Sequence, residues 1–152
     1  MINPLLAEPW TADILTLFPE MFPGTMGHSL AGRALKDGLW KLNVQNIRDF
    51  ARDKHKTVDD PPFGGGHGMV MRPDVTAAAL DHVLSGREQA KSPLLIYPSP
   101  RGLSLDQAYV KELSQTSGVV ILCGRYEGLD QRVIDHYPVS YTHLRAHETI
   151  AD

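Results

Sequence analysis

The stretch Val119–Arg132, VVILCGRYEGLDQR, decides the fold of this chain. It begins with an apolar run, breaks at Cys123-Gly124, displays the polar side chains of Arg125–Glu127, and then resumes with a helical pattern. A buried strand that ends in small residues and is followed by charged side chains is typical of a site at the carboxyl edge of an α/β sheet. We therefore expect a binding site at that edge.

A second apolar run, Pro93–Tyr97 (PLLIY), precedes this stretch, and a helical pattern separates the two. Neither run alternates with polar residues, which indicates strands buried on both faces, and the helix between them favours parallel neighbours. Further strands are predicted over Ala12–Phe18 and, near an edge of the sheet, over Leu39–Ile47. The expected fold class is α/β with a parallel-sheet core.

Capping residues mark the starts of the helices. The predicted helices are Leu30–Asp37 with Ser29 as N-cap, Pro73–Ser85 with Pro73 at its first position, and Leu105–Ser114 with a capping box from Ser104 and Gln107. From Arg48 to Gly68 the chain is too polar and too rich in proline and glycine for a regular element.

Composition predicts one domain and limits the kinds of site. The 152 residues carry a net charge of −3, so any contact with nucleic acid requires a local basic patch. The single cysteine, Cys123, excludes an intrachain disulfide and a cysteine zinc cluster, and its place after an apolar strand favours a small core residue. The N-terminal segment lacks the features of a signal peptide, and no apolar run is long enough to span a membrane. A cytoplasmic protein is expected.

Two loops, Tyr97–Gly102 and Cys123–Gly128, follow the two apolar runs and are expected to lie side by side. Glycines in both loops let backbone groups approach a ligand closely, and prolines fix the shape of the first loop. With the carboxylate of Glu127 and the aromatic face of Tyr126, the loops suit a neutral-to-cationic ligand with an adenine-like ring. The alternative, that both loops are only turns, stays open at this point.

The basic stretch Arg48–Lys56 lies shortly before the glycine cluster Gly64–Gly68. The candidates for phosphate contacts in this stretch are Arg48, Arg52, Lys54 and Lys56. The glycine cluster lacks both the Lys-Ser or Lys-Thr of a P-loop and the spacing of a dinucleotide fingerprint. A solvated charged face and a tight turn are the alternatives for these two segments.

Four motifs, in order along the chain, carry a family resemblance. They are FPEMF at Phe18–Phe22, GGGHGMVM at Gly64–Met71, YPSPRG at Tyr97–Gly102 and LCGRYEGLDQR at Leu122–Arg132. Together they resemble the bacterial tRNA (guanine-N1-)-methyltransferase family over residues 12–137. The resemblance implies a trefoil-knotted α/β fold of the SPOUT methyltransferase type and a homodimer. It also implies S-adenosylmethionine as donor of a methyl group to N1 of the guanosine directly 3′ of the anticodon in tRNA.

The resemblance also implies which residues bind the cofactor. The matching residues of the first cofactor loop are Tyr97, Pro98, Ser99, Pro100 and Gly102, and those of the second cofactor loop are Gly124, Arg125, Tyr126 and Glu127. Glu127 is the candidate ligand for the Mg²⁺ associated with the family. The family's catalytic base, an Asp that follows a third, glycine-rich cofactor loop, has no counterpart in this sequence, so no catalytic residue is assigned.

The sequence departs from the family pattern after Tyr137. Residues 138–152, PVSYTHLRAHETIAD, contain no apolar strand pattern and resemble an adapter-derived read-through peptide. We therefore divide the chain into a partial S-adenosylmethionine-binding methyltransferase domain, residues 1–137, and a non-native tail, residues 138–152, with the knot incomplete. On this interpretation the chain is expected to be inactive as a methyltransferase. A non-catalytic RNA-binding α/β module is the alternative function.

Overall fold

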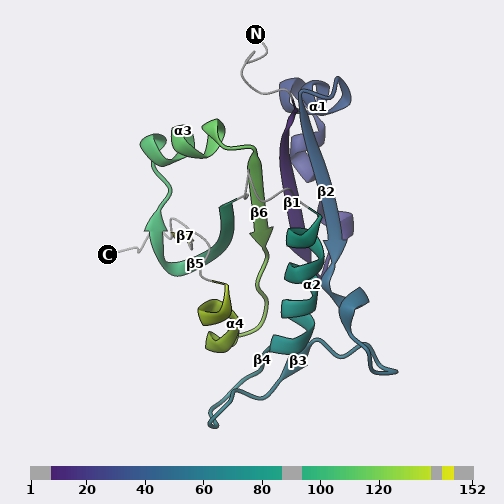
Figure 1. Cartoon of the computed structure of the whole chain (residues 1–152), viewed down its shortest axis with the longest axis vertical. Coiled ribbons are helices and arrows are strands. Elements are labelled where there is room, and N and C mark those ends of the chain that lie inside the picture. Colours follow the sequence, from purple (N-terminus) through teal and green to yellow (C-terminus); the bar gives the residue numbers. More distant parts are fainter. Residues whose placement is uncertain (1–7, 87–93, 138–141, 146–152) are drawn as a thin grey trace.

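The computed structural model describes residues 8–86 and 94–137, together with the backbone of residues 142–145 (Figure 1). At the centre of the fold lies a five-stranded sheet in the order β2-β1-β6-β5-β7, in which every neighbouring pair is parallel. The strands are β1 (Trp10–Thr16), β2 (Trp40–Asn46), β5 (Leu94–Ser104), β6 (Gly118–Leu122) and β7 (Thr142–Arg145). The expected α/β fold with a parallel sheet is confirmed, as are the edge position of β2 and the pairing of β5 with β6.

Helices, turns and one small ladder connect these strands. The helices are α1 (Ser29–Lys36), α2 (Pro73–Ser85), α3 (Gln107–Gln115) and α4 (Gln131–His136), the 3-10 turns are η1 (Pro19–Met21), η2 (Gly24–Gly27) and η3 (Ile47–Phe50), and β3 (Asp59–Asp60) pairs antiparallel with β4 (Val70–Met71). The predicted bounds of α2 are confirmed, because Pro73 occupies the first turn, where its missing N–H costs no hydrogen bond. The predicted Ser29 N-cap is wrong: His28 is the N-cap of α1, and Ser29 is the first helical residue, with a φ of 54°.

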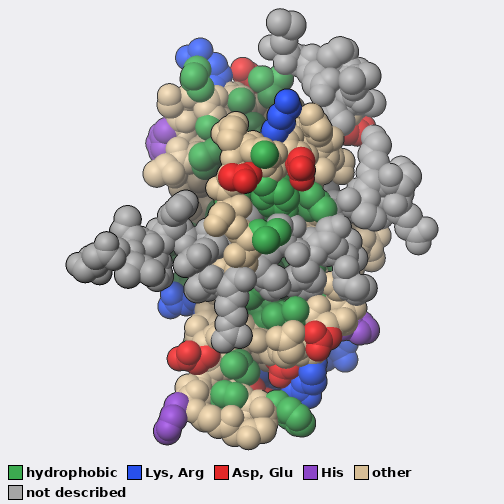
Figure 2. Space-filling view, turned by 90° about the vertical axis from the view of Figure 1, so that its left-hand side faces the viewer, with side chains coloured by type: hydrophobic (Ala, Val, Ile, Leu, Met, Phe, Trp, Pro, Cys, Tyr) green, Lys and Arg blue, Asp and Glu red, His purple; other side chains and the backbone are tan. Residues whose placement is uncertain are grey.

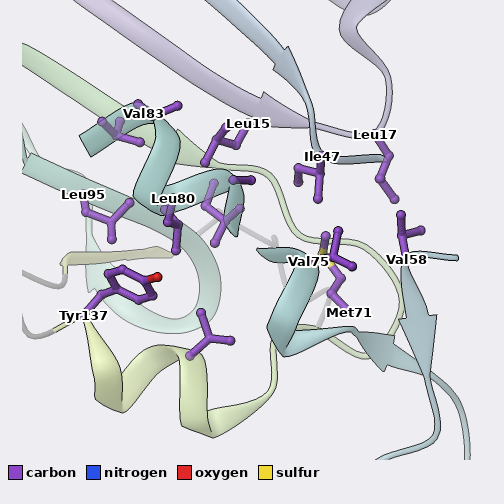
Figure 3. Packing of buried hydrophobic residues seen from close by; sticks show 14 of the residues in the cluster. Leu15, Leu17, Ile47, Val58, Met71, Val75, Leu80, Val83, Leu95 and Tyr137 are labelled. Carbon is purple, nitrogen blue, oxygen red and sulfur yellow. The ribbon is translucent and has the colours of Figure 1, made fainter. Parts of the chain in front are cut away.

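The face of the sheet covered by α2 forms the larger hydrophobic core (Figure 3). Leu15 of β1, Leu95 of β5 and Val120 of β6 point to this face and are at most 1% exposed. They belong to one cluster with Leu80 of α2, which is fully buried. Burying several such side chains removes enough apolar area from water to dominate the stability of the sheet.

The opposite face of the sheet is covered less completely. Ile14, Ile96 and Val119, each next in sequence to a residue of the larger core, turn to this side and form a second cluster. Helix α3 lies on this face, but none of its nine residues is buried. Between α3 and the sheet lies an open cavity of about 530 Å³. Its lining residues are Trp10, Ile96, Leu105, Val110, Leu113, Ser114, Val119 and Ile121.

Strand β5 is longer than predicted. The sequence predicts that the strand ends at Tyr97 and a sharp loop follows, but β5 continues to Ser104, with a register shift at which Pro98 and Leu103 both pair with Leu144. The predicted capping box is also wrong. Asp106 is the N-cap of α3, because its carboxylate accepts a hydrogen bond from the backbone N–H of Tyr109 at 2.8 Å.

The predicted absence of a strand after Tyr137 is wrong as well. The backbone of β7 lies within residues 138–152 and pairs in parallel with β5, although THLR is not an apolar sequence. The rest of that segment lies outside the described residues, so the division at residue 137 and the incomplete knot stay predictions. Among the described helices, none combines the length and apolarity that crossing a membrane requires.

Candidate functional site at the carboxyl edge of the sheet

The carboxyl ends of β1, β2 and β6 point to one end of the molecule, where α4 and the β3–β4 loop also lie (Figure 1). The backbone N–H of Cys123 donates to the carbonyl of Leu15 at 2.9 Å, so the second cofactor loop leaves the sheet beside β1. Burial raises the pKa of the Cys123 thiol. The thiol is therefore protonated near neutral pH, which agrees with the prediction of a small packing residue and not a nucleophile.

The side chain of Tyr97 joins the two predicted cofactor loops. A Cβ atom added at Gly124 would lie 2.7 Å from Cε2 of Tyr97, and one added at Gly128 would lie 3.0 Å from its hydroxyl oxygen. Glycine at both positions therefore lets the aromatic ring lie against the second loop. Burial raises the pKa of Tyr97, while a hydrogen bond with the backbone of Leu129 acts in the opposite direction. The prediction that the loops lie side by side is confirmed, and their role in binding a cofactor stays a prediction.

The other predicted residues of the first cofactor loop lie in the irregular part of β5. Pro98 is exposed, and Ser99 and Gly102 are half-buried. Pro100 lies between them, and the structure describes its backbone only. The register shift between Pro98 and Leu103 marks a bulge in the ladder with β7, and bulges are common next to binding sites.

Two features of the second cofactor loop were not predicted from the sequence: the contact that Arg125 makes and the backbone conformation of Tyr126. The guanidinium carbon of Arg125 lies 5.1 Å from the ring centroid of Phe18, so the FPEMF motif contacts this loop directly. Tyr126 has a φ of 59°, a value that non-glycine residues rarely adopt, and its side chain is 50% exposed. A strained and exposed aromatic residue in a candidate site is consistent with a role in binding.

The residues directly after the glycine cluster are hydrogen-bonded to the second cofactor loop. The backbone N–H of Glu127 donates to the carbonyl of Met69, and that of Met71 donates to the carbonyl of Gly128, both at 3.0 Å. A Cβ atom added at Gly68 would lie only 2.7 Å from Cγ of Glu127. Gly68 is thus a site residue that the sequence analysis missed. The only signal in the sequence was that this residue is a glycine. A glycine indicates that another group lies close to the backbone, but it does not indicate that this group is Glu127.

Asp130 and Arg132 hold the end of the second cofactor loop. The Asp130 carboxylate accepts hydrogen bonds from Nε and Nη2 of Arg132 at 2.9 and 2.7 Å, and it also caps α4 by accepting from the backbone N–H of Arg132 at 2.9 Å. These bonds lower the pKa of the nearly buried Asp130. On its other side, the guanidinium carbon of Arg132 lies 4.6 Å from the ring centroid of Phe63. The sequence analysis missed both Arg132 and Phe63.

The basic stretch is exposed at all four predicted positions. Nη1 of Arg48 donates to the carbonyl of Lys56, and Nζ of Lys56 donates to the carbonyl of Ala51, both at 3.0 Å, so these two side chains hold the backbone of the stretch itself. Arg52 and Lys54 are better candidates for contacts with phosphate. On the face that Figure 2 presents, acidic and basic side chains are interspersed, so this face carries no continuous basic surface.

A magnesium site at Glu127 gains no support. Within residues 8–86 and 94–137, no three His, Cys, Asp or Glu side chains gather as ligands of a metal ion would. Magnesium is commonly held by one or two carboxylates together with water, and Glu127 supplies a single carboxylate. The Mg²⁺ site therefore stays a prediction without support among the described residues, and no step of a reaction is assigned to the ion.

The sequence that forms this site is similar to a known protein family. The family model described as tRNA (Guanine-1)-methyltransferase TrmD matches residues 11–143. The match includes both predicted cofactor loops, the glycine cluster and the basic stretch, and it extends beyond Tyr137 into the segment that we predicted to be foreign.

Three similar curated proteins are each named tRNA (guanine-N(1)-)-methyltransferase. Over 128 residues the chain is 55% identical to the protein of Ehrlichia ruminantium (strain Gardel), 55% identical to that of Wolbachia pipientis subsp. Culex pipiens (strain wPip) and 52% identical to that of Rickettsia rickettsii (strain Sheila Smith). Each alignment covers 84% of this chain and 53% or 54% of the relative. The chain therefore spans about half the length of the curated relatives it matches.

Proposed function

The chain belongs to the tRNA (guanine-1)-methyltransferase family, and we propose that its activity is transfer of a methyl group from S-adenosylmethionine to N1 of the guanosine directly 3′ of the anticodon in tRNA. The observation that carries this proposal is the contact of Tyr97 with Gly124 and Gly128, which brings two glycine-bearing loops together at the carboxyl edge of a parallel sheet. Ligands bind at that edge in α/β folds.

The same contact indicates how the chain would hold the cofactor. The residues proposed to bind it are Tyr97, Pro98, Ser99, Pro100, Gly102, Gly124, Arg125, Tyr126 and Glu127. S-adenosylmethionine supplies an electrophilic methyl group on a sulfonium. In the transfer a bond from guanine N1 to the methyl carbon forms as the sulfur–carbon bond breaks, and the N1 proton leaves to a base. The described residues contribute alignment of donor and acceptor, and we assign the base to none of them.

We test the cofactor site by titrating S-adenosylmethionine into the purified chain and following binding by ligand-observed NMR, which detects weak complexes. Gly124→Val should abolish binding, because even a Cβ atom at this position meets the ring of Tyr97. Gly86→Ala is the matched control, since Gly86 has a φ of −77° and space for a methyl group at the end of α2. Unchanged binding by a folded Gly124→Val variant would contradict the proposed site.

A second candidate function is a non-catalytic RNA-binding module. Its support is the exposure of Arg52 and Lys54 in a stretch that leads into the β3–β4 loop. RNA binding driven by such residues weakens steeply with salt. Salt-sensitive binding of tRNA, combined with no affinity for S-adenosylmethionine, would favour this function over the methyltransferase.

Three further parts of the proposal concern the state of the protein. We propose a cytoplasmic homodimer, supported by exposed apolar side chains around α1, where Met21 is 66% and Leu30 is 77% exposed. Sedimentation velocity should show a dimer at micromolar concentration.

We also propose that residues 138–152 are foreign to the domain formed by residues 1–137, so that this polypeptide transfers methyl groups slowly or not at all. The nucleotide sequence of the source gene after the Tyr137 codon tests that division.

A further inference from the structure

We propose that Phe63 and Arg132 form a stacking platform for an unpaired base of an RNA loop. The proposal rests on the proposed function, because it assumes that the chain binds tRNA, and it names the pair of side chains that meets a base outside the cofactor loops. Phe63 is 81% exposed, more than the other large apolar side chains in the described part of the chain. The exposed ring of Phe63 offers an aromatic face on which a base can stack.

The backbone around Phe63 keeps the ring at the surface. Gly64 and Gly65, which follow it, have φ values of 86° and 88°, and the N–H of Gly65 donates to the carbonyl of Pro62 at 3.1 Å. Prolines at positions 61 and 62 restrict the chain before it. The turn therefore displays Phe63 in a set direction, away from the hydrophobic core.

Arg132 is oriented before any ligand arrives. The guanidinium of Arg132 donates two hydrogen bonds to the Asp130 carboxylate, which fixes the guanidinium plane, and the Asp130 side chain is only 6% exposed. One side of the guanidinium lies over the Phe63 ring, yet 58% of the Arg132 side chain is exposed. Planar guanidinium groups and aromatic rings are the two kinds of side chain on which proteins stack splayed-out bases.

The charges of the pair favour a base over a phosphate. The positive charge of Arg132 is balanced by Asp130, and Asp60 lies close enough to raise the pKa of Arg132 further. A phosphate would be attracted weakly here and more strongly to Arg52 and Lys54. A stacked base needs no net positive charge, because its attraction comes from its flat π surface.

The platform lies beside the candidate site. Phe63 precedes the glycine cluster, Met69 and Met71 after the cluster are hydrogen-bonded to the second cofactor loop, and Arg132 follows that loop. A base on the platform would therefore lie near the proposed cofactor site at Tyr97 and Gly124, which the target guanosine must approach to accept the methyl group. We assign the platform to an unpaired neighbour of the target guanosine.

The test uses an RNA hairpin with the sequence of a tRNA anticodon arm, in which 2-aminopurine replaces one unpaired loop base at a time. Stacking quenches 2-aminopurine fluorescence, so one loop position next to the target should lose fluorescence when the 152-residue chain binds. Phe63→Leu should remove that quenching and weaken binding about tenfold, the size of one base–aromatic contact. Phe63→Tyr should keep both the quenching and the affinity for the hairpin, because tyrosine keeps the aromatic face.

Two more variants separate stacking from other causes. Arg132→Lys keeps the charge and loses the planar group, so it should lose part of the quenching; an unchanged signal would mean that Arg132 acts only as a charge. Leu39→Ala removes another exposed apolar side chain, which is 51% exposed and lies just before β2, and it should change neither the quenching nor the affinity for the hairpin.

The outcomes distinguish this proposal from the function on which it rests. Hairpin binding with equal affinity and equal quenching in wild type and Phe63→Leu would overturn the platform and leave RNA binding intact. Absence of any hairpin binding, by a chain whose circular dichroism shows it folded, would overturn both. A Phe63→Leu variant that binds the hairpin normally but self-associates less in sedimentation would show that Phe63 contacts protein, which also overturns the platform.

Discussion

The two faces of the central sheet are built from alternate residues of the same strands, yet they are covered very differently. On one face, α2 contributes four buried apolar residues to the larger core, and η3, α4 and Met71 also contribute to it. On the other face, α3 contributes none, and a cavity of about 530 Å³ remains between helix and sheet. The strands are equally apolar on both faces, because consecutive residues point to opposite faces and both are apolar. Leu15 and Val120 point to the larger core, and the preceding residues, Ile14 and Val119, point to the second cluster.

The difference in coverage between the two faces indicates which part of the described structure contributes most to its stability. Burial of apolar area stabilises in proportion to the area removed from water, and it is concentrated on the side of α2. The two loops predicted to bind the cofactor begin at the carboxyl ends of the strands, between the two faces, so one side of the candidate site adjoins the closely packed layer and the other adjoins the layer with the cavity.

The largest expected effect comes from truncating the centre of the covered face. Leu80→Ala in α2 should lower the free energy of unfolding by about 2–5 kcal/mol, because Leu80 is fully buried and leaves a cavity. Leu113→Ala in α3, the counterpart on the open face, should cost about 1 kcal/mol or less. Urea unfolding followed by circular dichroism measures both. Equal losses would break the comparison.

A smaller loss is expected from Tyr137→Phe. The Tyr137 hydroxyl lies 2.8 Å from Oδ1 of Asp81 and 3.0 Å from the carbonyl of Ala77, and it ties the end of α4 to α2. Removing one hydrogen bond of this kind should cost about 1 kcal/mol, while the ring keeps its place in the core. Urea unfolding of the variant measures the loss. A variant as stable as wild type would show that packing of the ring alone joins these helices.

Asp130→Asn should cost about 1 kcal/mol at neutral pH and nothing in acid. Its bonds to Arg132 lower the pKa of Asp130 in the folded state, so the folded protein binds the proton less readily than the unfolded chain. The stabilisation is therefore complete above the unfolded Asp pKa of about 3.9 and is lost as the pH falls through the lower folded value. Unfolding curves of both proteins across that range should converge, and a constant difference would contradict the assignment.

The smallest effect is predicted on the open face. Val110→Ala should change the free energy of unfolding by less than about 0.5 kcal/mol, because Val110 is 39% exposed at the wall of the cavity. Val83→Ala in α2 is the matched variant, since Val83 is 8% exposed and packs in the larger core. If both variants lose the same free energy of unfolding, α3 packs against the sheet as closely as α2 does, and the difference between the two faces is wrong.

Periodicity and chain order were enough to predict most of the fold. Two uninterrupted apolar runs with a helix between them predicted the pairing of β5 with β6, and Pro73 marked the start of α2. Predictions of helix N-caps failed where two nearby residues could each cap the same helix. Ser104 fits a capping box by spacing, but Asp106 stands nearer the helix and its carboxylate caps α3 instead.

The candidate site was predictable only in part, for a physical reason. The two cofactor loops follow adjacent strands, so the topology of the sheet brings them together, and the sequence patterns reveal that topology. The contacts of Gly68 with Glu127 and of Phe63 with Arg132 depend on the path of an irregular loop. Such a path is determined by backbone hydrogen bonds between distant segments, which no periodicity in the sequence encodes.

The central position of β1 has a consequence for how the protein folds. β1 pairs with β2 soon after it is made, but its other edge waits for β6, and Trp10 Nε1 reaches the carbonyl of Leu113 across 103 residues of chain. Contacts between such distant segments lower folding rates, because loop-closure entropy is lost before the contacts form. During synthesis on the ribosome, β1 therefore presents an unpaired edge until β6 emerges, and the nascent chain is open to edge-to-edge association throughout that interval.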